Sequence, residues 1–203
     1  CNEALRMGRV LADLIRTEPE VYGLVALMEI QVSRFKARTN SEGEMILLQD
    51  QNRSLWNQEH IGRGVASLKK AEDLRGTFGM YALQAAIATC HAKADPPEKT
   101  NWNRISALYD ALSEIAPSPV VELNRAVAIS MAYGPKAGLE MVDSLIEEPA
   151  LRNYHLLPSV RANLLLKLGR KREASEEFQR AALLTQNVQE RKFLLKQAKD
   201  CMK

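Results

Sequence analysis

Residues 162–181 read ANLLLKLGRKREASEEFQRA, and the order of small and large side chains in this stretch decides the fold. Two small residues, Ala162 and Ala174, lie on either side of Gly169. Leu165 and Phe178 follow them at helical spacing. Small residues let two helices approach closely, large ones fill the space beside the contact, and glycine permits the tight turn. The stretch therefore predicts two antiparallel helices joined at Gly169.

The same pattern recurs upstream, which indicates a repeat with the spacing of tetratricopeptide (TPR) units. The positions 36 residues earlier hold Ala126, Ile129, Gly138 and Val142. The second half of a third, stretched unit matches at Ile105, Tyr109, Leu112 and Pro117. One unit alone is equally consistent with an ordinary helical hairpin. Recurrence at a near-constant period favours a TPR-like right-handed superhelical solenoid, whose concave groove binds extended peptides or partner helices.

Proline, glycine and capping residues divide the chain into helices, and strand-like alternation is almost absent. Ser118 before Pro119 marks one helix start, and the Asn187-x-x-Glu190 spacing resembles a capping box at another. We predict an all-α fold of about ten helices in antiparallel α-hairpins, over about residues 2–16, 18–37, 57–73, 78–94 and 101–116, from 119, from 135, over 154–168 and 171–185, and from 187. Gly76 and Gly79 separate the third from the fourth. Two domains are expected: a helical segment at 1–75 with an ordered loop at 38–56, and TPR-like repeats at 76–203.

Composition and charge narrow the class of protein. Of the 203 residues, 46% are apolar and 26% charged, and the net charge of +3 is too low to predict an electrostatic grip on nucleic acid. Residues 161–203 hold 11 basic against 5 acidic side chains, which predicts a basic, solvated surface. Three scattered cysteines, and no signal peptide or apolar run that fits a membrane span, favour a cytoplasmic protein. The chain opens without methionine and in helical register, so we expect a piece of a longer polypeptide.

Patterns for catalysis or metal binding are not visible. His60, His91 and His155 have no triad-like partners in the sequence. His91 and the adjacent Cys90 point about 100° apart on a helix, so they cannot readily chelate one ion. Nucleotide-binding and nucleophile-elbow motifs are missing. We therefore predict no catalytic residue, no metal, no cofactor and no enzymatic activity.

Residues 49–56, QDQNRSLW, form the most distinctive polar segment. In one interpretation it is an ordered linker, in which Trp56 precedes an Asn57 N-cap. Asp50 and Arg53 then bind nearby backbone or pair with Arg34 and Glu44. In the other, Arg53 and Trp56 are a docking point for another domain, because Arg and Trp are favoured interface anchors. The candidate interaction loop comprises Asp50, Gln51, Arg53 and Trp56. Candidate polar contacts in a groove are Arg34, His91, Asn124 and Arg125.

Seven segments, taken in order, resemble one known family: the C-terminal, TPR-like extension of bacterial extracytoplasmic-function (ECF) RNA polymerase sigma factors. They are CNEALRMGRVLADLI (1–15), EPEVYGLVALMEI (18–30), EGEMILLQDQNRSLWN (42–57), YALQAAIATCHAKA (81–94), NWNRISALYDAL (101–112), APSPVVELNRAVAISMAYGPKAGL (116–139) and YHLLPSVRANLLLKLGR (154–170). The loop of that family is closer to DQDRSRW. Asn52 and Leu55 depart from it, so a charge-based role is not expected at those two positions.

The resemblance implies a regulatory role in transcription. It implies that two helical domains preceding this chain bind polymerase and read the promoter, so this chain does not itself bind DNA. The extension then modulates sigma activity in cis. The implied partners are the protein's own sigma domains and RNA polymerase, with a small DGPF/YCII-like protein as a further candidate. Two alternatives stay open: a freestanding TPR-like peptide-binding scaffold, and a small-molecule sensor or cryptic enzyme, which needs a deep pocket with converging polar groups.

Overall fold

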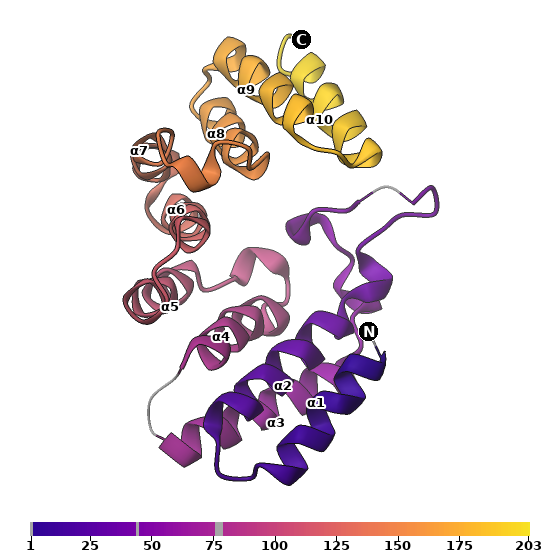
Figure 1. Ribbon diagram of the computed structural model, residues 1–203. Helices are drawn as coiled ribbons and strands as arrows, with labels where there is room; N and C mark the ends of the chain where they lie inside the picture. The colour runs from indigo at the N-terminus through magenta and orange to yellow at the C-terminus, as the bar shows by residue number, and fades with distance from the viewer. Residues whose placement is uncertain (1, 44, 76–78) are drawn as a thin grey trace. The chain divides into compact units, whose positions relative to one another are not determined.

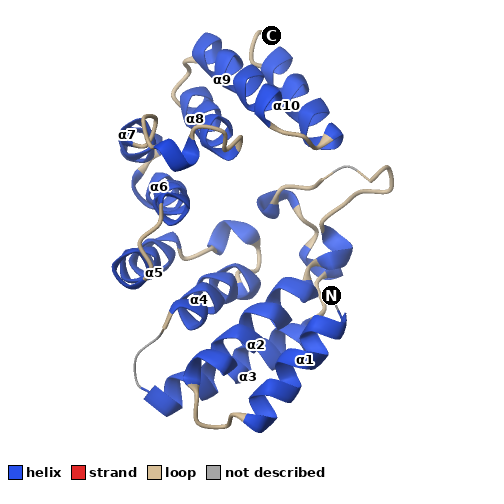
Figure 2. Cartoon of the chain, in the orientation of Figure 1, coloured by secondary structure: helices blue, strands red, loops and turns tan. Residues whose placement is uncertain are grey.

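The structure is a computed structural model that describes residues 2–43, 45–75 and 79–203. Over these residues the chain forms ten α-helices and five short 3₁₀ helices (Figure 1, Figure 2). Extended backbone pairs there only in an isolated bridge, Thr39 with Met45, and no strand is present. The predicted all-α fold and the number of helices are confirmed. Within this described part, no helix is both long and apolar enough to cross a bilayer.

The α-helices begin and end close to the predicted positions. Their bounds are α1 Asn2–Leu14, α2 Pro19–Ser33, α3 Gln58–Arg75, α4 Met80–Lys93, α5 Trp102–Ile115, α6 Pro119–Tyr133, α7 Pro135–Ser144, α8 Leu156–Lys167, α9 Lys171–Leu184 and α10 Val188–Asp200. The 3₁₀ helices are η1 Phe35–Ala37, η2 Leu48–Asp50, η3 Arg53–Leu55, η4 Pro97–Lys99 and η5 Pro149–Leu151. The second helix was predicted to reach residue 37; instead α2 ends at Ser33 and η1 follows. The predicted helix start at Phe78 and the separating Gly76 lie outside the described residues.

Two compact units divide the chain: unit 1, residues 1–116, and unit 2, residues 117–203. The domain boundary predicted between residues 75 and 76 was placed where the repeat pattern begins, whereas the two units are defined by their internal contacts. That boundary stays a prediction. Helices α4 and α5, which the repeat pattern groups with the later helices, pack within unit 1. There α4 contacts α2 and α3, and α5 contacts α4.

In unit 1 the central helix is α2, with α1, α3 and α4 packed against it. Contact on several sides explains why α2 is apolar nearly all round. The approach to α4 is so close that a Cβ on Gly23 would lie 2.6 Å from the backbone N of Ala82. Helix α4 lacks a capping side chain of its own. The Glu20 carboxylate accepts from the N–H groups of Tyr81 (2.8 Å) and Ala82 (3.2 Å), so α2 supplies the cap.

In unit 2 the helices α6 to α10 pack in chain order, each against its neighbours. Five residues of the stretch 162–181 are 0% exposed: Ala162, Leu165, Ala174, Phe178 and Ala181. Gly169 has a φ of 76°, a conformation that glycine adopts without steric cost. The α8–α9 hairpin predicted from this stretch is therefore present, with its small and large residues in the contact. Leu194, Ala198 and Cys201 on or beside α10 complete the core of the unit.

Candidate functional site

Trp56 anchors the polar loop by being buried, with 3% of the residue exposed. Its ring lies in a small core with Ala37 and Ile61. Asn57 caps α3, because its Oδ1 accepts from the N–H of His60 at 3.0 Å. Trp56 and Ile61 stand on either side of this cap, at the spacing of a hydrophobic staple. Of the two interpretations, the burial of Trp56 favours the ordered linker. A docking role for the loop would need its exposed residues, because the Trp56 side chain is not accessible to another domain.

Two arginines flank the Trp56 ring. The Cζ atom of Arg53 lies 4.2 Å from the ring centroid and that of Arg34 lies 5.2 Å from it, which is the range of cation–π contacts. The Arg53 guanidinium also donates to the backbone carbonyl of His91 on α4. Gln51 accepts from Arg34 Nε at 3.4 Å and donates to the carbonyl of Ile46 at 3.1 Å. Tertiary structure thus joins Arg34, Gln51, Arg53, Trp56 and His91 into one cluster, called here the Trp56 cluster.

The Trp56 cluster is electropositive. Among the described residues neither Arg34 nor Arg53 forms an ion pair with a carboxylate. Burial, with the charges of Arg38 and Arg53, lowers the pKa of Arg34 to about 10. Burial, with the charges of Arg53 and Arg34, lowers the pKa of His91 to about 4. His91 is therefore neutral near pH 7, and its ring packs edge-on against Trp102 at 5.2 Å.

The remaining three predicted residues are not members of the Trp56 cluster. Asp50 is exposed at the end of η2. Asn124 and Arg125 lie on α6 in unit 2, where Asn124 is exposed and Arg125 is half-buried and paired with Glu122 at 3.2 Å. A predicted ion pair of the loop with Glu44 lies outside the described residues. Of the eight candidate residues, five meet in unit 1.

Unit 1 contains a buried carboxylate, that of Glu29, which the sequence analysis did not predict. Glu29, which is 1% exposed, sits on α2 between two basic groups. Its Oε1 accepts from Arg9 Nε at 2.8 Å, and its Oε2 lies 2.6 Å from His60 Nδ1. An acidic residue inside the apolar run VALMEIQV was the available signal, because a buried charge needs a partner. Glu29, Arg9 and His60 thus join α2, α1 and α3, and we interpret this cluster, called here the Glu29 cluster, as stabilising the packing of the three helices.

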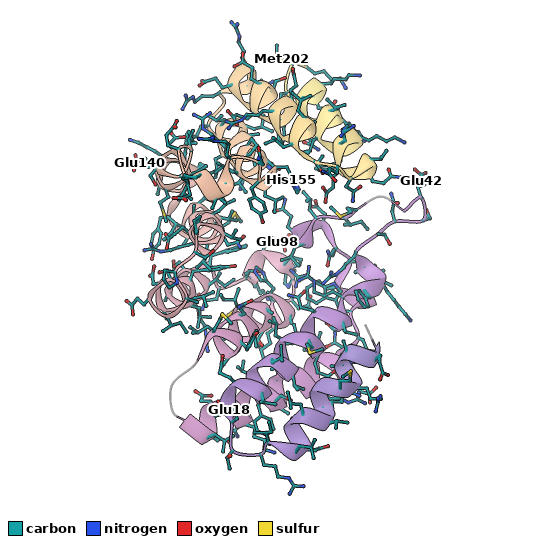
Figure 3. The ribbon with its side chains drawn as sticks, in the orientation of Figure 1. Glu18, Glu42, Glu98, Glu140, His155 and Met202 are labelled. Carbon is teal, nitrogen blue, oxygen red and sulfur yellow. The ribbon has the colours of Figure 1, made fainter. Side chains whose placement is uncertain are left out.

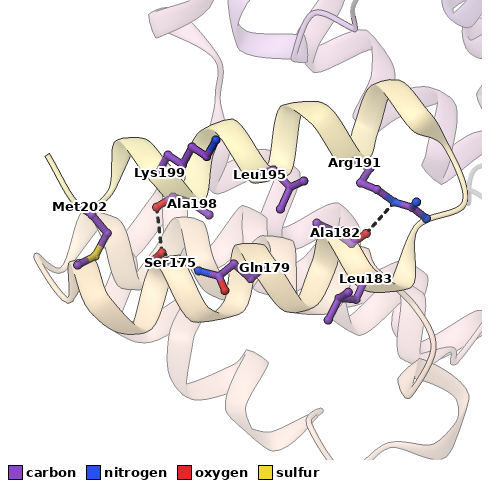
Figure 4. Close-up of a pocket in the computed structure, with 9 residues that line it drawn as sticks. All are labelled: Ser175, Gln179, Ala182, Leu183, Arg191, Leu195, Ala198, Lys199 and Met202. Carbon is purple, nitrogen blue, oxygen red and sulfur yellow. Dashed lines mark hydrogen bonds between the residues drawn. The ribbon is translucent and has the colours of Figure 1, made fainter.

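A second missed feature lies between the last two helices of unit 2. A groove of about 620 Å³ runs along α9 and α10 (Figure 4). Its lining includes Ser175, Ala182, Leu183, Leu195, Ala198 and Met202. Leu183 is 84% exposed and Met202 65% exposed, although both are apolar. We call this feature the α9–α10 groove.

Backbone and side-chain hydrogen bonds hold the walls of the groove together. Ser175 Oγ donates to the carbonyl of Ala198 at 2.9 Å, which joins the two helices at one end. At the other end Arg191 donates to the carbonyl of Ala182 in the last turn of α9 (3.2 Å, Figure 4) and to that of Thr185, the residue after α9 (2.8 Å). The groove is thus a built feature rather than a gap between loosely joined helices.

The start of α10 differs from the predicted capping box. Asn187 accepts from the N–H groups of Gln189 and Glu190, as predicted. Glu190 does not return to the Asn187 N–H; it accepts from Thr185 Oγ1 at 2.6 Å and lies 3.3 Å from Nε2 of His155, the residue labelled in Figure 3. A tertiary contact with the start of α8 therefore replaces the local half of the box. Across the described part of the chain, no three His, Cys, Asp or Glu side chains gather as metal ligands.

Residues 1–72 match a protein family described as a family of unknown function (DUF6596). An uncharacterized protein of Rhizobium meliloti (strain 1021) is 45% identical over 194 residues, covering 96% of this chain and 45% of that protein. The chain thus spans a little under half the length of the relative. No solved structure matches the chain.

Proposed function

We propose that this chain is a non-catalytic regulatory and protein-interaction module of an ECF-type RNA polymerase sigma factor, which modulates transcription initiation in cis in the cytoplasm. The observation that carries the interaction role is the α8–α9 hairpin, in which Ala162, Leu165, Ala174 and Phe178 are all 0% exposed. TPR-like hairpins place small and large residues in this way and present their remaining faces to partners.

A TPR-like right-handed solenoid is the finer form of the fold that belongs to this proposal. Support comes from the order of packing in unit 2, where each helix contacts the next. Further support comes from Gly138 on α7, where an added Cβ would lie 2.4 Å from Cβ of Ser130 on α6. The α6–α7 hairpin therefore needs a small residue at the position that Ala174 occupies in the α8–α9 hairpin, 36 residues later.

The link to transcription rests on the resemblance of seven ordered segments to the sigma-factor extension. The length of the relative agrees with it, because a protein more than twice as long has room for further domains. In this proposal the partners are the protein's own sigma domains and RNA polymerase, with a DGPF/YCII-like protein as a further candidate. Contact with promoter DNA is assigned to the other domains.

A freestanding peptide-binding scaffold is the second candidate, and the α9–α10 groove is the observation that favours it. The two candidates differ in what adjoins this chain in the full-length polypeptide: sigma-type helical domains for the first, none for the second. A reading of the full-length sequence separates them directly.

The proposal is tested by deleting the region corresponding to residues 1–203 from the full-length protein. Transcription from the cognate promoter is then measured in a reconstituted system with RNA polymerase. We expect a changed level of transcript or a lost response to regulation, with promoter binding retained by the remaining domains. A matched control carries Tyr133→Glu, an exposed substitution in the module, and should behave as the wild type. Unchanged output and unchanged regulation after the deletion would disprove the regulatory role.

A further inference from the structure

The α9–α10 groove has the dimensions of a short helix. Its lining runs from Ser175 to Leu183 on α9 and from Arg191 to Lys199 on α10, with Met202 just beyond the end of α10. At 1.5 Å per residue each helical span is about 12 Å, and Met202 extends the second one, so the groove has the length of two to three helical turns. The groove has a volume of about 620 Å³, and its apolar residues Leu183 and Met202 are exposed to solvent. Contiguous exposed apolar surface of this kind marks an interaction site.

Basic side chains border the groove. Lys199 lines it, and Lys192 lies two turns earlier on the same side of α10. Among the described residues neither lysine forms an ion pair. On α9 the exposed Glu176 is already paired with Arg172 at 3.3 Å. The border therefore carries two lysines that no ion pair within the described part of the chain neutralises.

The distribution of charge argues against a second copy of the chain as the occupant. A two-fold contact through this groove places α10 of one copy near α9 and α10 of the other. Lys192, Lys196 and Lys199 of both copies then lie close together, and like charges across an interface oppose association. A partner with acidic borders meets the same surface with attraction.

We propose that the α9–α10 groove binds an amphipathic helix of a separate partner protein, whose apolar stripe of two to three turns is flanked by Asp and Glu. Apolar side chains of that helix pack against Leu183, Leu195 and Met202, in the helix-in-groove mode of recognition. Its carboxylates face Lys192 and Lys199. This inference rests on the proposed interaction module and names the chemistry of one of its partners.

The test uses the 203-residue chain and a fluorescent, helix-constrained peptide of about four turns with a leucine stripe flanked by glutamates. A second peptide carries lysine at every glutamate position. Fluorescence anisotropy should show the acidic peptide binding at least about tenfold more tightly than the basic one, with the preference reduced at high salt. Leu183→Glu should weaken binding of the acidic peptide by at least about tenfold. Lys199→Glu should weaken binding of the acidic peptide several-fold and strengthen binding of the basic peptide.

The matched control is Tyr133→Glu, because Tyr133 on α6 is 65% exposed and does not line the groove. This variant should bind the acidic peptide as the wild type does. Leu183 is also exposed, so thermal unfolding of Leu183→Glu should match the wild type and show that lost binding is not lost folding.

Absent binding, equal binding of the two peptides, or unchanged binding by Leu183→Glu overturns the inference. So does self-association of the chain that Leu183→Glu abolishes, because the occupant is then a second copy. The peptide assay involves no transcription, so it fails separately from the proposed function. A deletion without effect on transcript leaves the peptide result standing, and lost peptide discrimination leaves the transcription result standing.

Discussion

The Arg53 guanidinium lies 4.2 Å from the centre of the Trp56 ring and donates to the backbone carbonyl of His91. One side chain thereby connects the polar loop, the start of α3 and the end of α4. Arg53 and Trp56 make these contacts within unit 1, so the loop is part of the fold of that unit.

Replacement of Trp56 should therefore destabilise the protein strongly. We expect Trp56→Ala to lower the free energy of unfolding by about 3–5 kcal/mol, because a large buried side chain leaves a cavity. Leu55→Ala is the matched control, since Leu55 is the exposed neighbour, and it should change the value by less than about 0.5 kcal/mol. Urea unfolding followed by far-UV circular dichroism measures both. Equal effects of the two variants would contradict the anchoring role of Trp56.

His91 should make stability depend on pH. Its pKa is lowered from 6.5 to about 4, so between these values the unfolded chain binds a proton that the folded chain does not. The contribution is complete above pH 6.5 and is lost as the pH falls toward 4, by up to about 3 kcal/mol. His91→Gln should remove this part of the pH dependence in urea unfolding at about pH 7 and about pH 4.5. The same pH dependence in both proteins would show that His91 is not the group responsible.

The Glu29 cluster predicts an asymmetry between buried and exposed ion pairs. Glu29→Ala leaves His60 and Arg9 without their shared partner inside the α1–α2–α3 contact, and we expect a loss of about 3 kcal/mol. Glu3→Ala breaks the exposed pair with Arg6 and should cost less than about 0.5 kcal/mol. Chemical denaturation of both variants makes the comparison. A loss below about 1 kcal/mol for Glu29→Ala would mean that water replaces the carboxylate.

Two glycines of unit 1 should respond in opposite directions to alanine. A Cβ on Gly23 would lie 2.6 Å from the backbone of Ala82, so Gly23→Ala should cost about 1–3 kcal/mol by forcing α2 and α4 apart. A Cβ on Gly62, inside α3, meets nothing within 4 Å. Gly62→Ala should therefore stabilise by about 0.5–1 kcal/mol, through a less flexible unfolded chain. Differential scanning calorimetry reports both shifts; two shifts of the same sign would contradict the packing of α2 on α4.

Local patterns predicted the helices because the information for them is local. Ser118 accepts from the N–H of Val120 and Pro119 opens α6, as their side chains dictate without reference to the rest of the chain. The chain turns at Gly169 between α8 and α9 because glycine adopts the required positive φ whatever the rest of the chain does. The apolar periodicity places Phe178 in the core, because one face of a helix must be covered.

Contacts between distant residues could not be predicted in this way. Glu20 caps α4 from another helix, and Glu190 turns from its own helix start to Thr185 and His155. The sequence near each carboxylate offers no means of choosing these partners, because only the packing of the helices brings them within reach.

The sequence by itself determined that the chain is all-helical, where its helices lie and that residues 162–181 form a hairpin, because spacing and capping act over a few residues. Tertiary structure alone decided that Trp56 is buried between two arginines, that Glu29 joins three helices and that α9 and α10 leave an apolar groove. Burial and exposure are properties of the surfaces that meet. A pattern of side chains along one helix does not state which of its faces a neighbour will cover.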